Sequence, residues 1–185
     1  MKEERIELTG DVVARRREGD FCGKVIAHDA ANIGVWYYVN GEYHRVRRGA
    51  KNVICLDGQG NVELYAYRRT NINGEVTNAF WVCDDNNRRC NVTVKFVYRI
   101  FDLPLFAASK LTGGRRAIDE STLSTEIMNN DIIPFLKVNG IKVLKEIDIP
   151  NGIVAASADV LKTLRSADVL SRHGIELVNL KMSVR

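Results

Sequence analysis

The stretch VTVKFVYRIFD at residues 92–102 carries the clearest structural signal in the chain. Apolar side chains occupy every second position, and the positions between them are mostly polar. The apolar positions are Val92, Val94, Phe96, Tyr98 and Ile100. A period of two predicts a long β-strand with one face on a core and the other in water.

A strand partner for this stretch lies directly upstream, in VTNAFWVC at 76–83. Residues 84–89 separate the two segments, and the Asp and Asn side chains among them can hydrogen-bond their own backbone in a turn. Cys83 and Cys90 flank the turn, and we expect them to face each other across the strands as reduced thiols. The two segments therefore predict a β-hairpin.

Two further strand pairs precede that hairpin. IGVWYYV at 33–39 and EYHRVRR at 42–48 flank Asn40-Gly41, a strong hairpin signal because both residues tolerate positive φ. NVICL at 52–56 and NVELYAY at 61–67 flank a glycine-containing turn, and the alternation in the second predicts a half-buried antiparallel strand. The front of the chain therefore predicts antiparallel hairpins.

Helical segments are expected after the long strand. Asp119, Ser121 or Thr122 can cap a helix. Pro134 lacks the N–H group that a helix interior needs, so we expect a restart at Asp131 rather than one unbroken helix.

Two segments near the C-terminus share one pattern. NGIKVLKEIDI at 139–149 and HGIELVNLKMSV at 173–184 each place a glycine and then alternating apolar residues after a helical stretch. Gly140 and Gly174 are well placed as left-handed helix stops. Each segment therefore predicts a helix, a glycine stop and a strand.

The sequence Ser-Ala-Asp-Val-Leu occurs twice in this region, at 157–161 and 166–170. In one straight helix Leu161 and Leu170 would point to opposite sides, because nine residues make two and a half turns. Either the helix breaks near Ser166, or one leucine faces a partner.

The composition is that of an ordinary folded protein. The 185 residues are 45% hydrophobic and 27% charged, which excludes disordered, collagen-like and coiled-coil classes. No apolar run reaches the roughly 18 residues that span a bilayer, and the N-terminus lacks the apolar core of a secretory signal. We therefore expect a cytoplasmic location, peripheral to a membrane at most.

Motifs of the common catalytic and metal centres are missing from the sequence. It has no phosphate-binding loop, nucleophile elbow or zinc helix, and its cysteines and histidines lack metal-ligand spacing. We therefore expect no enzyme and assign no catalytic residue, metal, cofactor or small-molecule substrate. An enzyme site built from His44, Cys83 and Asp84 is the lowest-ranked alternative.

Arginine pairs recur near the ends of the expected hairpins. If those ends converge, the pairs would form a cationic rim suited to the phosphates of an anionic membrane surface or of RNA. We rank the membrane above nucleic acid, because no base-stacking aromatic motif accompanies the arginines. The anion-facing candidates are Arg47, Arg48, Arg68, Arg69, Arg88 and Arg89.

Three side chains are candidates for a protein interface. Trp36 and Tyr38 combine apolar area with a polar tip, and they share one face of the strand expected at 33–39. Leu170 is the leucine that would face a partner if the helix does not break.

Three short motifs occur in an order that resembles a known family. They are Asn40-Gly41, the strand Tyr98-Arg99-Ile100-Phe101-Asp102, and Gly174-Ile175-Glu176-Leu177 after a helix. Together they resemble the SPFH, or band 7, domain of the stomatin, prohibitin and flotillin superfamily, in particular its soluble bacterial virion-core-like branch. The resemblance covers roughly residues 24–184.

The resemblance implies an α+β domain without catalytic residues that works by self-assembly, often at membranes. It divides the chain into an N-terminal extension at 1–23 and a domain at 24–185, β-rich to residue 102 and built of helix-strand units from 103. Arg48 stands where the family has proline, and the coiled coil that usually follows the domain is missing. We therefore expect a self-associating scaffold that can dock on anionic membranes, with a nucleic-acid-binding module as the alternative.

Overall fold

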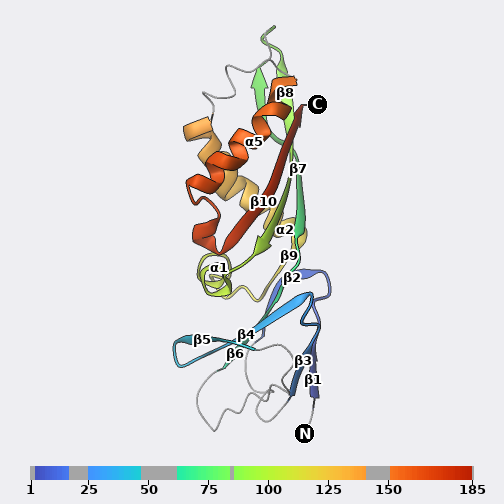
Figure 1. The fold of residues 1–185 in the computed structure, drawn as a ribbon, viewed down its shortest axis with the longest axis vertical. Helices are drawn as coiled ribbons and strands as arrows, with labels where there is room; N and C mark the ends of the chain where they lie inside the picture. Colours follow the sequence, from blue (N-terminus) through green and yellow to red (C-terminus); the bar gives the residue numbers. More distant parts are fainter. Residues whose placement is uncertain (1–2, 17–24, 47–61, 84–85, 141–150, 185) are drawn as a thin grey trace. The chain divides into compact units, whose positions relative to one another are not determined.

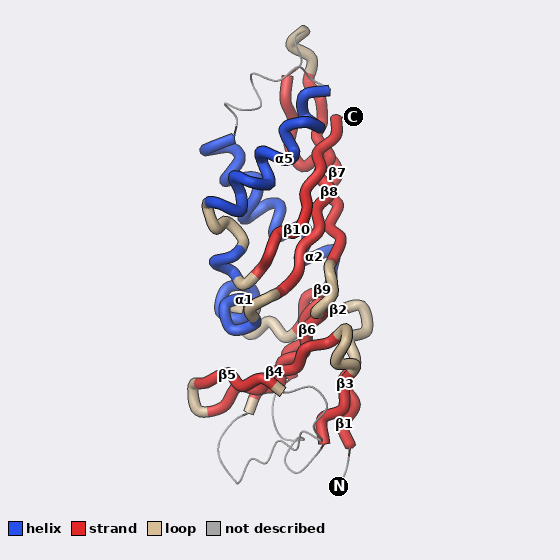
Figure 2. Tube along the Cα trace, in the orientation of Figure 1, coloured by secondary structure: helices blue, strands red, loops and turns tan. Residues whose placement is uncertain are grey.

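The protein has an α+β fold, as expected. The computed structural model describes residues 3–16, 25–46, 62–83, 86–140 and 151–184. Figure 1 traces the chain, and Figure 2 separates its helices from its strands. The chain forms two compact units, of which unit 1 comprises Met1–Thr70 and Asp102–Asp119 and unit 2 comprises Asn71–Phe101 and Glu120–Arg185.

Unit 1 is built mainly from a five-stranded sheet in the order β5-β4-β6-β2-β9. A second, two-stranded sheet pairs β1 and β3 in parallel. The strands are β1 (Glu3–Ile6), β2 (Asp11–Arg16), β3 (Val25–His28), β4 (Ile33–Val39), β5 (Glu42–Arg45), β6 (Glu63–Arg68) and β9 (Ala117–Asp119). Residues 1–23, expected to precede the domain, thus contain two strands of this unit.

The hairpin predicted around Asn40-Gly41 is confirmed. Strands β4 and β5 pair in antiparallel register, with Val39 opposite Glu42. Asn40 and Gly41 both have positive φ, 51° and 87°, as this two-residue turn requires. The strand expected at 52–56 lies outside the described residues.

Strand β6 differs from the expectation of a half-buried strand. It lies between β4 and β2, and Tyr65 and Tyr67 are buried like Leu64 and Ala66. The prediction was wrong because alternation reports the polarity of side chains, and tyrosine can be buried when its hydroxyl is bonded. The Tyr65 hydroxyl donates to Glu63 over 2.6 Å.

Helix α1 (Leu103–Lys110) also belongs to unit 1. The side chain of Asp102 accepts a hydrogen bond from the Leu105 backbone over 3.1 Å, which caps the helix start. Pro104 lies in the first turn, where a missing N–H costs nothing.

Unit 2 contains a three-stranded antiparallel sheet in the order β10-β8-β7. Its strands are β7 (Ile72–Cys83), β8 (Arg89–Ile100) and β10 (Ile175–Val184). The helical elements are α2 (Glu120–Glu126), the π-helix η1 (Ile127–Ile132), α3 (Ile133–Phe135), the π-helix η2 (Leu136–Gly140), α5 (Asn151–Ser166) and the 3-10 turn η3 (Ser171–His173). No described helix is long and apolar enough to cross a bilayer.

The expected restart of the helix at Asp131 is wrong. The chain stays helical from α2 through η2, and Pro134 lies inside α3. The turn before the proline widens to π geometry, in which the Ile133 N–H bonds the Met128 carbonyl five residues earlier. A π-turn shifts the hydrogen-bond ladder, and we infer that this shift accommodates a residue that can donate no bond.

Of the two alternatives for the repeated sequence, the structure shows the helix break near Ser166. Helix α5 ends at Ser166, and Asp168 has a left-handed φ of 52°. Gly174 also has a left-handed φ, 69°, directly before β10, as predicted. The strand expected after Gly140 lies outside the described residues.

The sheet of unit 2 has a buried inner face and a polar outer face. The apolar positions predicted for β8 are all buried, at 0–3% exposure. On the same face Ser124 of α2 bonds the Tyr98 hydroxyl over 3.2 Å. The outer face carries two cross-strand ion pairs, Lys95–Glu75 at 3.1 Å and Arg99–Glu176 at 2.6 Å.

Candidate assembly edge

The two outer strands of the unit 2 sheet, β10 and β7, differ in how their free edges are treated. An edge strand presents unpaired backbone N–H and C=O groups that can pair with another chain. Figure 1 shows α5 running beside β10, with β8 and then β7 farther away. The hydrogen bonds at each edge decide whether it is open.

Two carbonyls of β10 are capped by Arg165 of α5. Its Nε donates to the Leu177 carbonyl over 2.8 Å, and its Nη2 donates to the Val178 carbonyl over 2.7 Å. These carbonyls lie at a register shift in the β10–β8 pairing, between Leu177 and Asn179. A guanidinium fits this place because its planar fork donates in two directions at once.

Two N–H groups of β10 are also capped. The Met182 N–H donates to the buried Ser157 hydroxyl over 2.9 Å, and that hydroxyl donates to the Ile153 carbonyl over 3.2 Å. The Leu180 N–H donates to the side-chain oxygen of Asn179 over 2.9 Å. Side chains therefore occupy four backbone groups along β10, and we call this the sealed edge.

The same bonds reveal which groups of β7 face outward. Residues of an antiparallel pair alternate between hydrogen-bonded and non-bonded positions. Since the Met182 N–H bonds Ser157, the pair Met182–Val94 is of the non-bonded type, and the backbone of Val94 faces β7. Val94 pairs with Val76. Gly74, two residues before Val76, therefore also directs its N–H and C=O groups toward β8. The N–H and C=O groups of Asn73 and Glu75 point the other way, away from the sheet.

The backbone groups of β7 that point away from the sheet differ from those of β10, because no described side chain caps them. Within the ranges described, no side chain bonds the backbone of Asn73 or Glu75, and both side chains are exposed. A register shift between Val76 and Phe80, with Asn78 at φ 54°, interrupts the strand further on. The open edge is therefore the run Ile72–Val76.

Gly74 is required at the centre of that run. A Cβ at this position would lie 2.5 Å from Cζ of Phe96, the residue with which Gly74 pairs on β8. The Phe96 ring therefore covers the inner side of the open edge.

The end of the β7–β8 hairpin carries an aromatic and a cationic group. Trp81 is 54% exposed, and the Arg89 guanidinium lies 4.8 Å from the centre of its ring. The expectation that Cys83 and Cys90 face each other is wrong. Cys83 pairs with Arg89 and Cys90 pairs with Val82, so the two thiols point to opposite faces.

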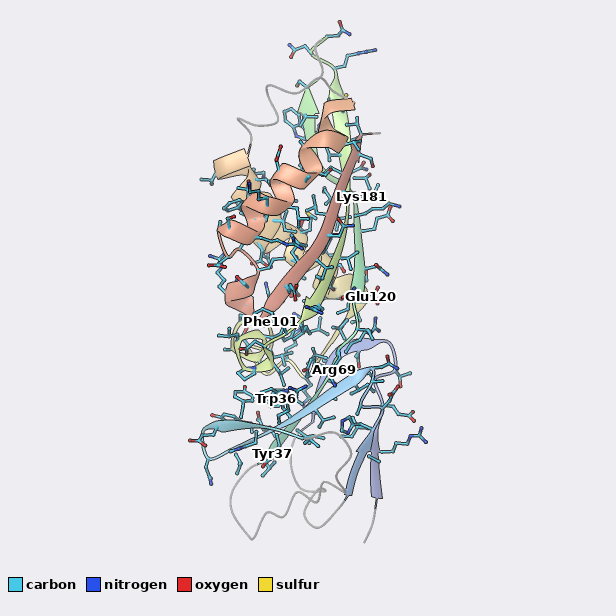
Figure 3. All side chains as sticks on the ribbon, in the orientation of Figure 1. Trp36, Tyr37, Arg69, Phe101, Glu120 and Lys181 are labelled. Carbon is cyan, nitrogen blue, oxygen red and sulfur yellow. The ribbon has the colours of Figure 1, made fainter. Side chains whose placement is uncertain are left out.

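The predicted arginine sites differ in their surroundings. Arg69, labelled in Figure 3, is bonded within its own unit. Its Nη1 donates to the Ala30 carbonyl over 2.8 Å, and its backbone N–H donates to the Asn32 carbonyl. Arg68 is half-buried, whereas Arg88 and Arg89 are exposed. Arg47 and Arg48 lie outside the described residues.

The predicted interface residues lie in two different units. Trp36 and Tyr38 are half-buried on β4 of unit 1, and the centres of the Tyr38 and Tyr43 rings lie 4.7 Å apart with the rings tilted by 51°. Trp36 is labelled in Figure 3. Leu170 is 3% exposed in unit 2, so its side chain belongs to the core of that unit.

The residues of the enzyme alternative belong to different parts of the chain. His44 lies in unit 1 and Cys83 in unit 2, and Asp84 is outside the described residues. A different acid–base pair exists, in which the His173 Nε2 lies 3.2 Å from the buried Asp131 carboxylate. Across the described ranges no three His, Cys, Asp or Glu side chains form a cluster that could hold a metal.

Unit 2 also contains one described pocket of about 340 Å³. Its lining is mostly apolar and includes Leu164, Ile175 and the half-exposed Phe101 (Figure 3). The one arginine in the lining is Arg165, which already bonds two β10 carbonyls. We assign the pocket no ligand.

Two side chains of unit 1 have perturbed acidity. Hydrogen bonds from the Asn32 side chain and the Ala31 backbone lower the pKa of Asp29 below its ordinary value. Burial, followed by the bond to Glu63, raises the pKa of Tyr65 above its usual range. Both groups belong to unit 1.

The structure thus defines an α+β chain in which the described sheet of unit 2 has one capped edge and one open edge. Comparison with protein-family models finds no match. Comparison with curated proteins finds no significant relative either.

Proposed function

We propose that this chain is a non-enzymatic assembly domain of the SPFH or band 7 type, which self-associates in the cytoplasm. The observation that carries the proposal is the contrast between the two edges of the unit 2 sheet. Four backbone groups of β10 are capped, whereas the Ile72–Val76 run of β7 is left open. The order of motifs along the sequence supports the family.

An open edge favours association because a further strand can pair with it. Strand addition supplies backbone hydrogen bonds for affinity and side-chain contacts for specificity. Each such bond contributes only about 0.5–1.5 kcal/mol net, and the run of five residues supplies few of them. We therefore expect weak, reversible association that depends on protein concentration, as suits a scaffold that gathers at high local density.

An anionic membrane surface is the second partner that we propose. The exposed Trp81 ring beneath the Arg89 guanidinium supports it, because tryptophan is enriched at membrane interfaces and arginine is attracted to anionic lipids. Arg88 adds a second exposed cation at the same hairpin end.

Light scattering across a concentration series tests self-association. The wild-type mass should rise above the 20.8 kDa of one chain. The Glu75→Pro variant should stay monomeric, because it lacks the outward N–H and a proline is tolerated on a free edge. Glu75→Ala is the matched control, since it loses the ion pair with Lys95 but keeps the N–H. A wild-type chain that is monomeric at every concentration would contradict the proposal.

Flotation with liposomes tests the membrane partner. Wild-type protein should float with anionic vesicles at low salt and should be released as salt rises. The Arg88→Ser/Arg89→Ser variant should float less, and Arg45→Ser, an exposed arginine on β5, serves as control. Equal flotation of both variants would show that the end of the β7–β8 hairpin is not the membrane-binding site. Salt-sensitive binding to RNA without flotation would favour the nucleic-acid alternative.

A further inference from the structure

We infer that the partner at the open edge is a second copy of this chain, joined antiparallel about a two-fold axis near Gly74, so that association through this edge stops at a dimer. The inference rests on the proposed function and names its partner and stoichiometry. It follows from which edges are open, which residues face outward and which charges would meet.

A sealed β10 disfavours the head-to-tail alternative. If β7 of one copy paired with β10 of the next, each copy would leave a new open edge and the sheet would grow without limit. Arg165, Ser157 and Asn179 occupy four backbone groups of β10, which disfavours such pairing. Within the unit 2 sheet the remaining self-pairing joins β7 to β7, and it uses up the β7 edge of both copies.

A two-fold axis makes two identical strands run antiparallel. The outward groups belong to Asn73 and Glu75, so these residues form the hydrogen-bonded pairs between copies. Centring the axis on Gly74 places Asn73 opposite Glu75 of the other copy, twice. Centring it on Glu75 would place two carboxylates directly opposite each other, which is unfavourable. Centring it on Asn73 would require Asn71, which lies outside the strand.

The Gly74-centred pairing also suits the inner face. Gly74 would lie opposite Gly74 of the second copy, and neither has a side chain to clash. The Phe96 ring of each copy already covers its own glycine. The outer face would carry Asn73 and Glu75 of both copies beside Lys95, which balances the carboxylate charge.

Charge substitutions at Asn73 test the register without altering the backbone. In the proposed pairing, Asn73→Lys should strengthen the dimer because each lysine meets a glutamate. Asn73→Asp should weaken it by like-charge repulsion. Two such pairs correspond to about a twofold to thirtyfold change in the dimer Kd, in opposite directions. Thr77→Lys, on the same strand beyond the paired residues, is the control and should change the Kd least.

Sedimentation equilibrium measures both the stoichiometry and these Kd values. The expected result is a mass that levels off at twice that of one chain, together with opposite effects of the two Asn73 variants. If both variants weaken the dimer, the two-fold axis lies at Asn73, where like charges would meet. If neither variant changes the Kd, the axis lies elsewhere. Either result overturns the proposed register. Growth beyond a dimer that Glu75→Pro still abolishes would overturn the inference while the proposed function stands. A monomer at every concentration would overturn the proposed function itself.

Discussion

Arg165 of α5 donates from Nε to the Leu177 carbonyl of β10 over 2.8 Å, and this bond joins a helix to the edge of a sheet. The carbonyl would otherwise be available to a strand from another molecule. Further along β10, the N–H of Met182 donates to the hydroxyl of Ser157, which also belongs to α5. One helix thus caps one edge, and the opposite edge, on β7, is the one through which we propose that the chain associates.

Removing the caps should open the second edge. We expect the Arg165→Ala/Ser157→Ala variant to form species larger than a dimer, because β10 could then accept a strand. We also expect its unfolding free energy to fall by about 1–3 kcal/mol, since three backbone groups lose their partners. Lys162→Ala, an exposed position on α5, is the control. A double variant that stays dimeric by light scattering would show that the caps do not limit growth.

The glycine at the centre of the open edge should tolerate no side chain. A Cβ on residue 74 would lie 2.5 Å from Cζ of Phe96. We expect Gly74→Ala to destabilise unit 2 by about 1–3 kcal/mol through overpacking. Thermal unfolding measures this against Thr77→Ala on the same strand. Equal melting temperatures would mean that the ring can move aside.

Arg69 should act on stability rather than on anion binding. Its side chain donates to the Ala30 carbonyl over 2.8 Å, which holds the turn before β4 to the end of β6. We expect Arg69→Ala to lower the unfolding free energy by about 1–2 kcal/mol. Urea denaturation measures this change in unfolding free energy, and Arg45→Ala, at an exposed arginine, is the control. An unchanged midpoint together with loss of liposome binding would return Arg69 to the anion-facing set.

The turn before β4 should also lose stability in acid. The Asp29 carboxylate accepts hydrogen bonds from Ala31 and Asn32, which lower its pKa in the folded protein below 3.8. Its contribution is therefore complete above that pH and is lost as the pH falls through the folded-state pKa. We expect the gap in urea midpoint between wild type and Asp29→Ala to narrow from pH 7 to pH 3. A gap that is constant with pH would contradict this.

Local signals in the sequence predict the strands of this fold well. The alternation around Phe96 predicts β8 and its buried face, and Asn40-Gly41 predicts the β4–β5 turn because that turn needs positive φ at both residues. Gly174 predicts the start of β10 for the same reason. Each of these features depends on residues adjacent in sequence.

The candidate site could not be predicted in this way. Whether Asn73 lies on an outer strand depends on the strand order, which no local pattern contains. Arg165 and Ser157 reach β10 across 12 and 25 residues of sequence, and nothing in the sequence distinguishes them from other polar residues of a helix. The expected restart at Asp131 failed because a π-turn accommodates Pro134, and helix rules assume α geometry throughout.

Amide hydrogen exchange at Asn73 and Glu75 tests the central claim most directly. If β7 pairs with a second copy, these two amides should exchange fast in dilute protein and become protected as the concentration rises. The amides of Met182 and Leu180 on the sealed edge should be protected at every concentration. Exchange at Asn73 and Glu75 that is equally fast in dilute and concentrated protein, while the mass rises, would show that the chain associates through some other surface.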